Sequence, residues 1–176
     1  MVNRTVYTIG HSTHSADEFV KIIQAYEIET VVDVRTIAKS LHNPQFGEEE
    51  LREHLRGQGI AYRRLEGLGG FRHSTNASAN TAWKNLSFRS YADYMQTPEF
   101  KESLEQLTQI AAEKQTVIMC AEAVPWRCHR SLIGDALLIR NIPVVDIMTE
   151  KTSRPHALTS FAKVDGYTIT YPRTTV

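Results

Sequence analysis

The order of apolar and polar residues along the chain predicts alternating strands and helices. Val6–Ile9 and Thr30–Val34 are short β-type runs. Between them, Phe19, Ile22 and Ile23 recur at the spacing of one helix face. A strand, a helix and a second strand in this order form the βαβ unit of a parallel sheet.

The same alternation continues toward the end of the chain. Further β-type runs are Ile60–Leu65, Thr116–Cys120 and Pro143–Ile147, and Tyr167–Tyr171 is a candidate for an additional edge strand. Helical patterns cover Glu48–Arg56, Phe88–Met95, a segment that starts at Thr97-Pro98 and runs through Ala111, and Ser131–Arg140. The patterns predict one α/β domain over residues 1–176, with a mostly parallel central sheet of about five strands flanked by helices.

Three local signals refine this prediction. Ser15 and Glu18 have the spacing of a capping box ahead of the first helix. Thr36–Gly47 is too irregular for a regular element and indicates a loop over the sheet. Phe71–Leu86 is polar and long, as binding loops and lids often are.

The composition is that of an ordinary globular protein. Of 176 residues, 41% are hydrophobic and 23% charged, which excludes a disordered chain. The 20 basic and 20 acidic residues cancel, so no overall field attracts nucleic acid or a membrane surface. A nucleic-acid partner therefore requires a local basic groove, and the charge balance does not indicate one.

The chain contains two cysteines, Cys120 and Cys128. Met1–Gly10 lacks the apolar stretch of a secretory signal, and no apolar run is long enough to span a bilayer. We therefore expect a cytoplasmic protein without a membrane anchor, in which a structural disulfide is not favoured.

Chemically versatile side chains follow several of the predicted strands. Because the carboxyl ends of parallel strands share one rim of a sheet, residues distant in sequence are expected to meet there. The rim candidates are His11, Ser12, Asp33, Arg35, Glu122, Cys128, His129 and Arg130. Asp146, near the end of Pro143–Ile147, is a further candidate.

Cys128 stands immediately before the predicted helix Ser131–Arg140. The positive end of a helix dipole, with His129 and Arg130 beside it, favours a thiolate and makes the sulfur nucleophilic. The alternative is a small buried residue at a helix start. Cys120 lies in an apolar run and is expected in the core. A redox pair of Cys120 and Cys128 needs close approach of their backbones, and their spacing is not that of a C-x-x-C motif.

The acid–base candidates also have structural alternatives. Asp33 and Glu122 are candidates for general base and general acid. Asp33 is equally suited to a structural ion pair with Arg35 or Arg130. His11 beside Ser12 is either a base next to a hydroxyl or a residue that bonds only a loop carbonyl, and Ser12 either binds substrate or caps the following turn.

Candidate substrate-binding residues supply cations, hydroxyls, aromatic surface or close backbone approach. They are Ser12, Arg35, Arg130, Pro44, Phe46, Gly69 and Gly70. Arginines and the N–H groups of a helix start suit a phosphate or carboxylate. Candidate metal ligands are His11, Glu122, Cys128 and His129, although their spacing matches no strong metal motif. The sequence indicates no particular cofactor.

Six segments carry a family resemblance. They are T-I-G-H-S at Thr8–Ser12, D-V-R at Asp33–Arg35, N-P-Q-F at Asn43–Phe46, L-G-G at Leu68–Gly70, C-A-E-A-V-P-W-R-C-H-R at Cys120–Arg130 and R-P-H-A-L-T at Arg154–Thr159. In this order they resemble the domain of unknown function 488 over nearly the whole chain. The resemblance implies a compact α/β protein whose signatures form one site, adding the Pro44 region and His156 to it. It implies no activity.

Three functions are open at this point. The first is a hydrolase or transferase for a small anionic, phosphate- or nucleotide-like substrate, bound by Arg35 and Arg130 and attacked by Cys128 or an activated water. The second is a non-catalytic nucleotide or nucleic-acid binding module with Phe46 and Trp83 as stacking platforms. The third is a metal site at the same rim.

Overall fold

The structure is a computed structural model that describes residues 4–73 and 77–174. Its strands are β1 (Val6–Gly10), β2 (Thr30–Asp33), β3 (Ala61–Arg64), β4 (Thr116–Cys120), β5 (Val144–Ile147), β6 (Ser153–Pro155), β7 (Lys163–Asp165) and β8 (Thr168–Thr170). Its α-helices are α1 (Ala16–Ala25), α2 (Glu48–Gly57), α3 (Leu86–Tyr94), α4 (Pro98–Glu113) and α5 (Arg130–Leu138). Short 3-10 turns, Pro44–Phe46, Glu66–Leu68 and Pro125–Arg127, interrupt the connecting loops.

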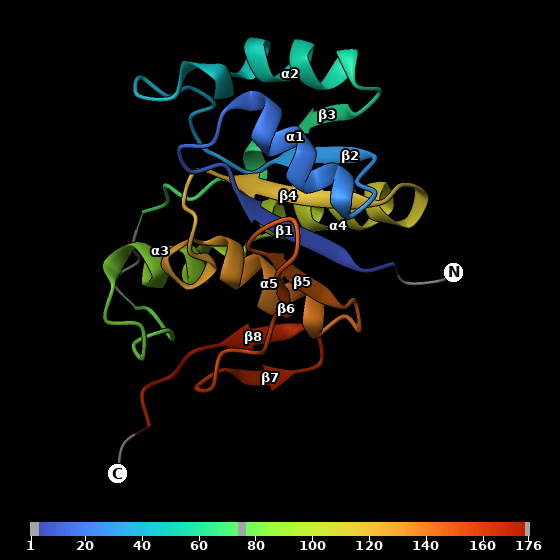
Figure 1. Cartoon of the computed structure of the whole chain (residues 1–176). Helices are drawn as coiled ribbons and strands as arrows, with labels where there is room; N and C mark the ends of the chain where they lie inside the picture. The colour runs from blue at the N-terminus through green and yellow to red at the C-terminus, as the bar shows by residue number, and fades with distance from the viewer. Residues whose placement is uncertain (1–3, 74–76, 175–176) are drawn as a thin grey trace.

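The central sheet has six strands in the order β3-β2-β4-β1-β5-β6. The first five are parallel and β6 is antiparallel to β5 (Figure 1). The mostly parallel α/β architecture is thus confirmed. β6 was not predicted, because the sequence of Ser153–Pro155 lacks the apolar alternation that is typical of a strand. In the structure all three of its residues are exposed.

The candidate edge strand Tyr167–Tyr171 does not join the central sheet. Its middle forms β8, which pairs only with β7 in a separate two-stranded hairpin near the C-terminal end of the chain (Figure 1). Gly166 has a φ of 61°, a conformation that suits glycine and allows the tight turn between the two strands. The run was therefore correctly identified as β-type, but its partner is local.

Apolar residues alternate along the strands and divide the core into two layers. Ile9, Val31 and Val117 pack against α1 and α2 on one face of the sheet. Val32 and Ile118 pack against α3, α4 and α5 on the other face. This two-sided burial is why the central strands read as continuous apolar runs.

The helix ends match the sequence signals. Ser15 precedes α1 and its hydroxyl accepts a hydrogen bond from the Glu18 N–H, as the capping-box spacing predicts. Thr97 caps α4 in the same way, with Pro98 at the first helical position. Of the predicted loop Phe71–Leu86, residues 74–76 lie outside the described part of the chain. Among the described residues, no helix is long and apolar enough to cross a bilayer.

The order of the strands creates a switch point between β1 and β4. These two strands are neighbours, but the chain leaves β1 toward α1 and leaves β4 toward α5, which lie on opposite faces. The two connections diverge at the carboxyl ends of the strands, and open α/β sheets bind ligands in such a crevice. Gly10 is required there, because a side-chain carbon added to it would lie 1.8 Å from the Glu122 carbonyl oxygen.

Candidate functional site

A pocket of about 340 Å³ opens at the switch point. Of the candidate site residues, the structure places His11, Arg35, Gly70, Glu122, Cys128 and His129 in its lining, and Cys120 lines it as well. The remaining lining residues come mainly from the loops after β2 and after the Glu66–Leu68 turn, and from the start of α3. The pocket lining therefore includes candidates from the segments after β1, β2, β3 and β4.

The two cysteines meet at the pocket. Their sulfur atoms lie 2.8 Å apart, both side chains are buried, and no disulfide joins them. Cys120 ends β4 and Cys128 follows the Pro125–Arg127 turn, so the turn folds the second thiol back onto the first. The expectation that Cys120 lies in the core is met, and the close approach to Cys128 adds a thiol pair.

The contacts of the pair favour one thiol and one thiolate. The hydrogen bond from Cys120 lowers the pKa of Cys128 well below that of an ordinary thiol, and contacts with His129 and Arg130 lower it further against the cost of burial. Burial and the same hydrogen bond raise the pKa of Cys120. Of the two sulfurs, Cys128 is therefore the one whose surroundings favour the thiolate.

Arg130 supplies the buried positive charge beside both sulfurs. It is 1% exposed, its Nε donates to Cys120 Sγ at 2.9 Å, and its backbone N–H donates to Cys128 Sγ at 3.5 Å. Its two remaining nitrogens donate to Thr8 Oγ1 and to the carbonyl of Glu122. A guanidinium this deeply buried needs a nearby negative charge, and the thiolate provides it.

His129 lies next to Cys128 in a defined orientation. Its Nε2 is 2.9 Å from the Val34 carbonyl oxygen, an acceptor only, so Nε2 carries the hydrogen of this bond. Its Nδ1 is 3.5 Å from Cys128 Sγ and is the nitrogen placed to take the thiol proton. Nucleophile, base and orienting group are thus in contact, the arrangement of an activated cysteine.

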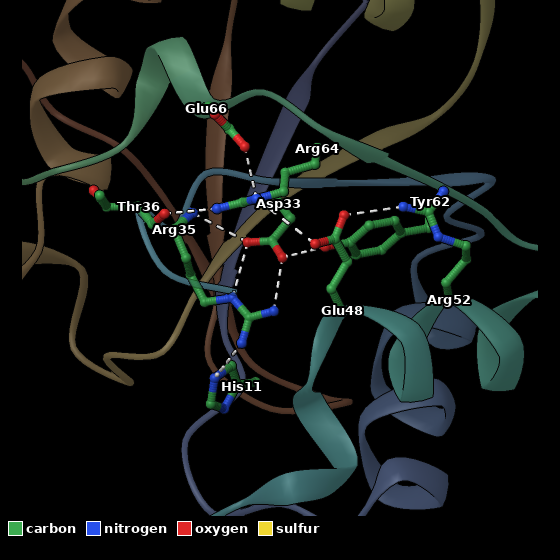
Figure 2. A network of polar contacts seen from close by, with 9 residues as sticks. All are labelled: His11, Asp33, Arg35, Thr36, Glu48, Arg52, Tyr62, Arg64 and Glu66. Carbon is green, nitrogen blue, oxygen red and sulfur yellow. Dashed lines mark hydrogen bonds and ion pairs between the residues drawn. The ribbon is translucent and has the colours of Figure 1, made fainter. Parts of the chain in front are cut away.

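Asp33 is saturated by structural partners (Figure 2). Arg35 donates to its two oxygens from Nε at 2.9 Å and Nη2 at 2.7 Å, and its backbone N–H adds a third bond. The Tyr62 hydroxyl of β3 donates a fourth. Asp33 is fully buried and does not line the pocket. This geometry matches the ion-pair alternative and leaves Asp33 poorly placed for proton transfer.

His11 is held neutral between two partners. Its Nδ1 is 2.9 Å from the Ser12 carbonyl oxygen and its Nε2 is 3.5 Å from Arg35 Nη1, the end of the arginine not bonded to Asp33 (Figure 2). Burial lowers the pKa of His11, and the Arg35 charge lowers it further. Phe46 stacks on the ring at 4.3 Å and fixes its plane.

Glu122 is exposed and lines the pocket. Its Oε1 accepts one hydrogen bond, from the Val124 N–H. Lys39 and Arg127 are exposed cations that line the same pocket, together with buried Arg35. Cationic groups therefore outnumber the single carboxylate of the lining.

The remaining candidates lie outside the pocket lining. Ser12 has a φ of 49° at the start of the turn after β1. Pro44 is exposed, and Gly69 is buried against Thr36. Phe46 is fully buried, and Trp83 packs against Phe88, Phe161 and Tyr171. Phe46 therefore offers no open face to a nucleobase, whereas Trp83 is only partly buried.

The proposed metal ligands do not converge. Within the described part of the chain, no three His, Cys, Asp or Glu side chains are arranged to hold a metal ion. The thiols contact each other, His129 and Arg130 instead. The residues present fit a thiolate held by cations better than a metal centre.

A buried network of polar side chains lies behind the thiols, and the sequence predicted only part of it. Arg130 donates to Thr8 Oγ1 at 3.0 Å, and Thr8 donates to Asp146 Oδ1 at 2.6 Å. His156 lies between Asp146, at 3.5 Å, and Asp135, at 2.9 Å. A polar residue within an apolar strand or helix is the sequence signal for such a buried network. This signal identified only Asp146 as a candidate, because the partners of a polar residue are not visible in one sequence.

The comparisons with known proteins yield one family. The model described as "Domain of unknown function DUF488" matches residues 15–137. T-I-G-H-S at Thr8–Ser12 and R-P-H-A-L-T at Arg154–Thr159 lie outside the match, and the other four segments lie inside it. No curated protein and no solved structure matches the chain.

Proposed function

The chain belongs to the DUF488 family, which carries no assigned activity, and from its candidate site we propose that it is an enzyme that uses Cys128 as a nucleophile on a small anionic substrate. The observation that carries the proposal is the position of the Cys128 sulfur. It lies in contact with the Cys120 thiol, with an oriented imidazole and with the backbone N–H of Arg130, at the wall of an open pocket. Packing alone does not require this combination of partners.

The lining of the pocket supports an anionic substrate. Lys39 and Arg127 are exposed cations of its lining, and Arg35 presents one guanidinium nitrogen toward His11. A carboxylate or phosphate entering the pocket would meet these donors. Ile37 and Phe71, which are 60% and 77% exposed, line the same pocket and suit an apolar part of the substrate.

The catalytic roles follow from the contacts. Cys128 attacks the electrophilic atom of the substrate as a thiolate. His129 holds the displaced thiol proton on Nδ1 and returns it to the leaving group. Arg130 balances the negative charge while it remains on sulfur, and Glu122 is the exposed carboxylate available to a later acid–base step. Asp33 and His11 keep Arg35 in position.

The nucleophile can be tested before a substrate is known. Native protein is treated with iodoacetamide over pH 5 to 9 and Cys128 is followed by mass spectrometry. Because its charge is stabilised, Cys128 is expected to react at a nearly constant rate down to acidic pH. A rate that instead rises through the ordinary thiol range, about pH 8.5, would contradict the proposal.

The anion preference is tested with the charged analogue. Relative to a free thiol in solution, Cys128 is expected to favour iodoacetate over iodoacetamide, because cations line its pocket. Lys39→Gln and Arg127→Gln should each lower the iodoacetate rate a few-fold and leave the iodoacetamide rate unchanged. Lys114→Gln, an exposed cation outside this pocket, is the matched control. Equal effects on both reagents would argue against anion binding.

A further inference from the structure

The candidate site contains a second thiol that a single nucleophile does not need. Resting on the proposed function, we infer that Cys120 is a resolving thiol, and that the protein reduces a small anionic disulfide by passing two electrons from the Cys120–Cys128 pair. The substrate class is a molecule with a sulfur–sulfur bond and a nearby carboxylate or phosphate.

The first support is the contact between the sulfurs. At 2.8 Å they are closer than two unbonded sulfur atoms normally pack, and each is buried among fixed partners. Cys120 ends a central strand and Cys128 is tied by hydrogen bonds of the turn before it and the helix after it. A bond between them therefore needs little movement of any element.

The second support is the place of Arg130. Two thiols that serve only as core packing would not attract a guanidinium that is 1% exposed. The nearest link from Arg130 to a carboxylate, Asp146, passes through the Thr8 hydroxyl. Arg130 Nε instead contacts Cys120 Sγ, the sulfur that must become a thiolate in the second step of a dithiol reaction.

The third support is what the two-thiol arrangement adds chemically. Hydrolysis or group transfer needs only one sulfur nucleophile. A second thiol in contact with the first is required only when the reaction ends in a bond between them. Thiol–disulfide exchange uses sulfur alone as electron carrier and needs a proton carrier beside it, which is the position of His129.

The electrons and atoms balance over two exchanges. Cys128 thiolate attacks one sulfur of the substrate R–S–S–R′, the S–S bond breaks, and R′–S⁻ leaves and takes a proton through His129. The Cys120 thiol then gives up its proton and its sulfur attacks Cys128 Sγ, which expels R–S⁻ as the second thiol. The substrate gains two electrons and two protons, and the protein keeps a Cys120–Cys128 disulfide.

The cycle closes with a low-molecular-weight thiol as reductant. Both cysteines line the pocket, so the new disulfide remains accessible to a second small molecule. Its formation removes the negative charge that balances Arg130, and this penalty falls on the oxidised form. The same stabilisation of the reduced form makes a disulfide readily reduced, as a catalytic rather than a structural disulfide requires.

An anionic aromatic disulfide, 5,5′-dithiobis(2-nitrobenzoate), provides the test. Reduced full-length protein is mixed with the reagent, thionitrobenzoate release is followed by absorbance, and intact mass is measured after acid quenching. The native chain is expected to release two equivalents, the second in a step whose rate does not depend on reagent concentration. Its mass should fall by two hydrogens with no adduct, since the chain has only two cysteines.

Single variants separate the two thiols. Cys120→Ser should release one equivalent and keep a stable adduct on Cys128, and Cys120→Ala serves the same purpose if the serine variant does not fold. Cys128→Ser should react slowly, because Cys120 is buried and lacks a lowered pKa. Circular dichroism checks that each variant is folded.

The outcomes distinguish this inference from the proposed function. A native chain that keeps an adduct on Cys128, or adducts on both cysteines, overturns the resolving role of Cys120 but leaves Cys128 as an accessible nucleophile. A native chain in which neither cysteine reacts removes both proposals.

Discussion

At the scale of single residues, Gly70 controls the orientation of the base. A side-chain carbon added at this position would lie 2.8 Å from His129 Nδ1, closer than unstrained contacts allow. The ring cannot simply turn away, because its other nitrogen is bonded to the Val34 carbonyl. Gly70 thus has a steric reason for its identity, independent of any approach to a ligand.

Gly70→Ala is therefore expected to displace His129 from Cys128. The acidic pH at which the alkylation rate of Cys128 begins to fall should rise by about one unit, because loss of the His129 contact raises the pKa of the thiol. The measurement is the iodoacetamide rate as a function of pH. Gly57→Ala is the control, because an added carbon there meets nothing within 4 Å. An unchanged pH profile in Gly70→Ala would mean that His129 does not assist the thiolate.

At the scale of elements, the bond network around Asp33 joins β2, β3 and the loop that follows β2. Asp33 and Arg35 form a two-pronged ion pair with both side chains at most 6% exposed, and Tyr62 donates from β3 (Figure 2). Arg64 of β3 extends the network to the Thr36 carbonyl of that loop. The end of β2 is therefore fixed by side chains as well as by the sheet.

Removing one partner should reveal this role. Asp33→Asn leaves the Arg35 charge buried and unpaired, and the free energy of unfolding is expected to fall by about 3 to 5 kcal/mol. Tyr62→Phe removes one hydrogen bond and should cost about 1 to 2 kcal/mol. Urea denaturation measures both. If Asp33 acted as a base with no structural role, the two variants would have similar, small effects on stability.

Helices and strands were predictable where their sequence signal is local. Residues of the pocket lining were predictable where they directly follow the end of a strand. β4 was predicted with the observed bounds, Thr116–Cys120, because its apolar run begins after Lys114-Gln115 and ends shortly before Glu122. The strand order and β6 could not be predicted, since pairing partners are set by tertiary contacts. For the same reason, one sequence could not predict the contact between Cys120 and Cys128 or the contact between Arg130 and Thr8.

At the scale of the whole molecule, the C-terminal region is linked to the thiols through buried polar groups. His156, just after β6, lies between Asp135 of α5 and Asp146 of β5, and Tyr171 also donates to Asp135. Burial alone would lower the pKa of His156, but its hydrogen bonds to the two carboxylates outweigh this and raise the pKa to about 9. His156 is thus a buried cation at neutral pH.

This predicts a pH-dependent contribution to stability. The pKa of His156 is higher in the folded protein than in the unfolded chain, so its contribution is complete below about pH 6.5 and is lost as pH rises through about 9. His156→Gln should therefore be less stable than the native chain by up to about 3 kcal/mol at pH 6. The difference should shrink toward pH 10 in denaturation curves recorded across this range. A constant difference would indicate that only packing is lost.

The exposed Arg127 between the two thiols has a practical consequence. It is the only basic residue between Cys120 and Cys128 in the sequence, and basic residues also stand at Lys114 and Arg130. Trypsin therefore places the cysteines on different peptides, Gln115–Arg127 and Cys128–Arg130. The two peptides remain covalently linked when the sulfurs are bonded and separate when they are not. A tryptic digest of protein whose free thiols were blocked at lysis therefore records the oxidation state that the two cysteines had in the cell.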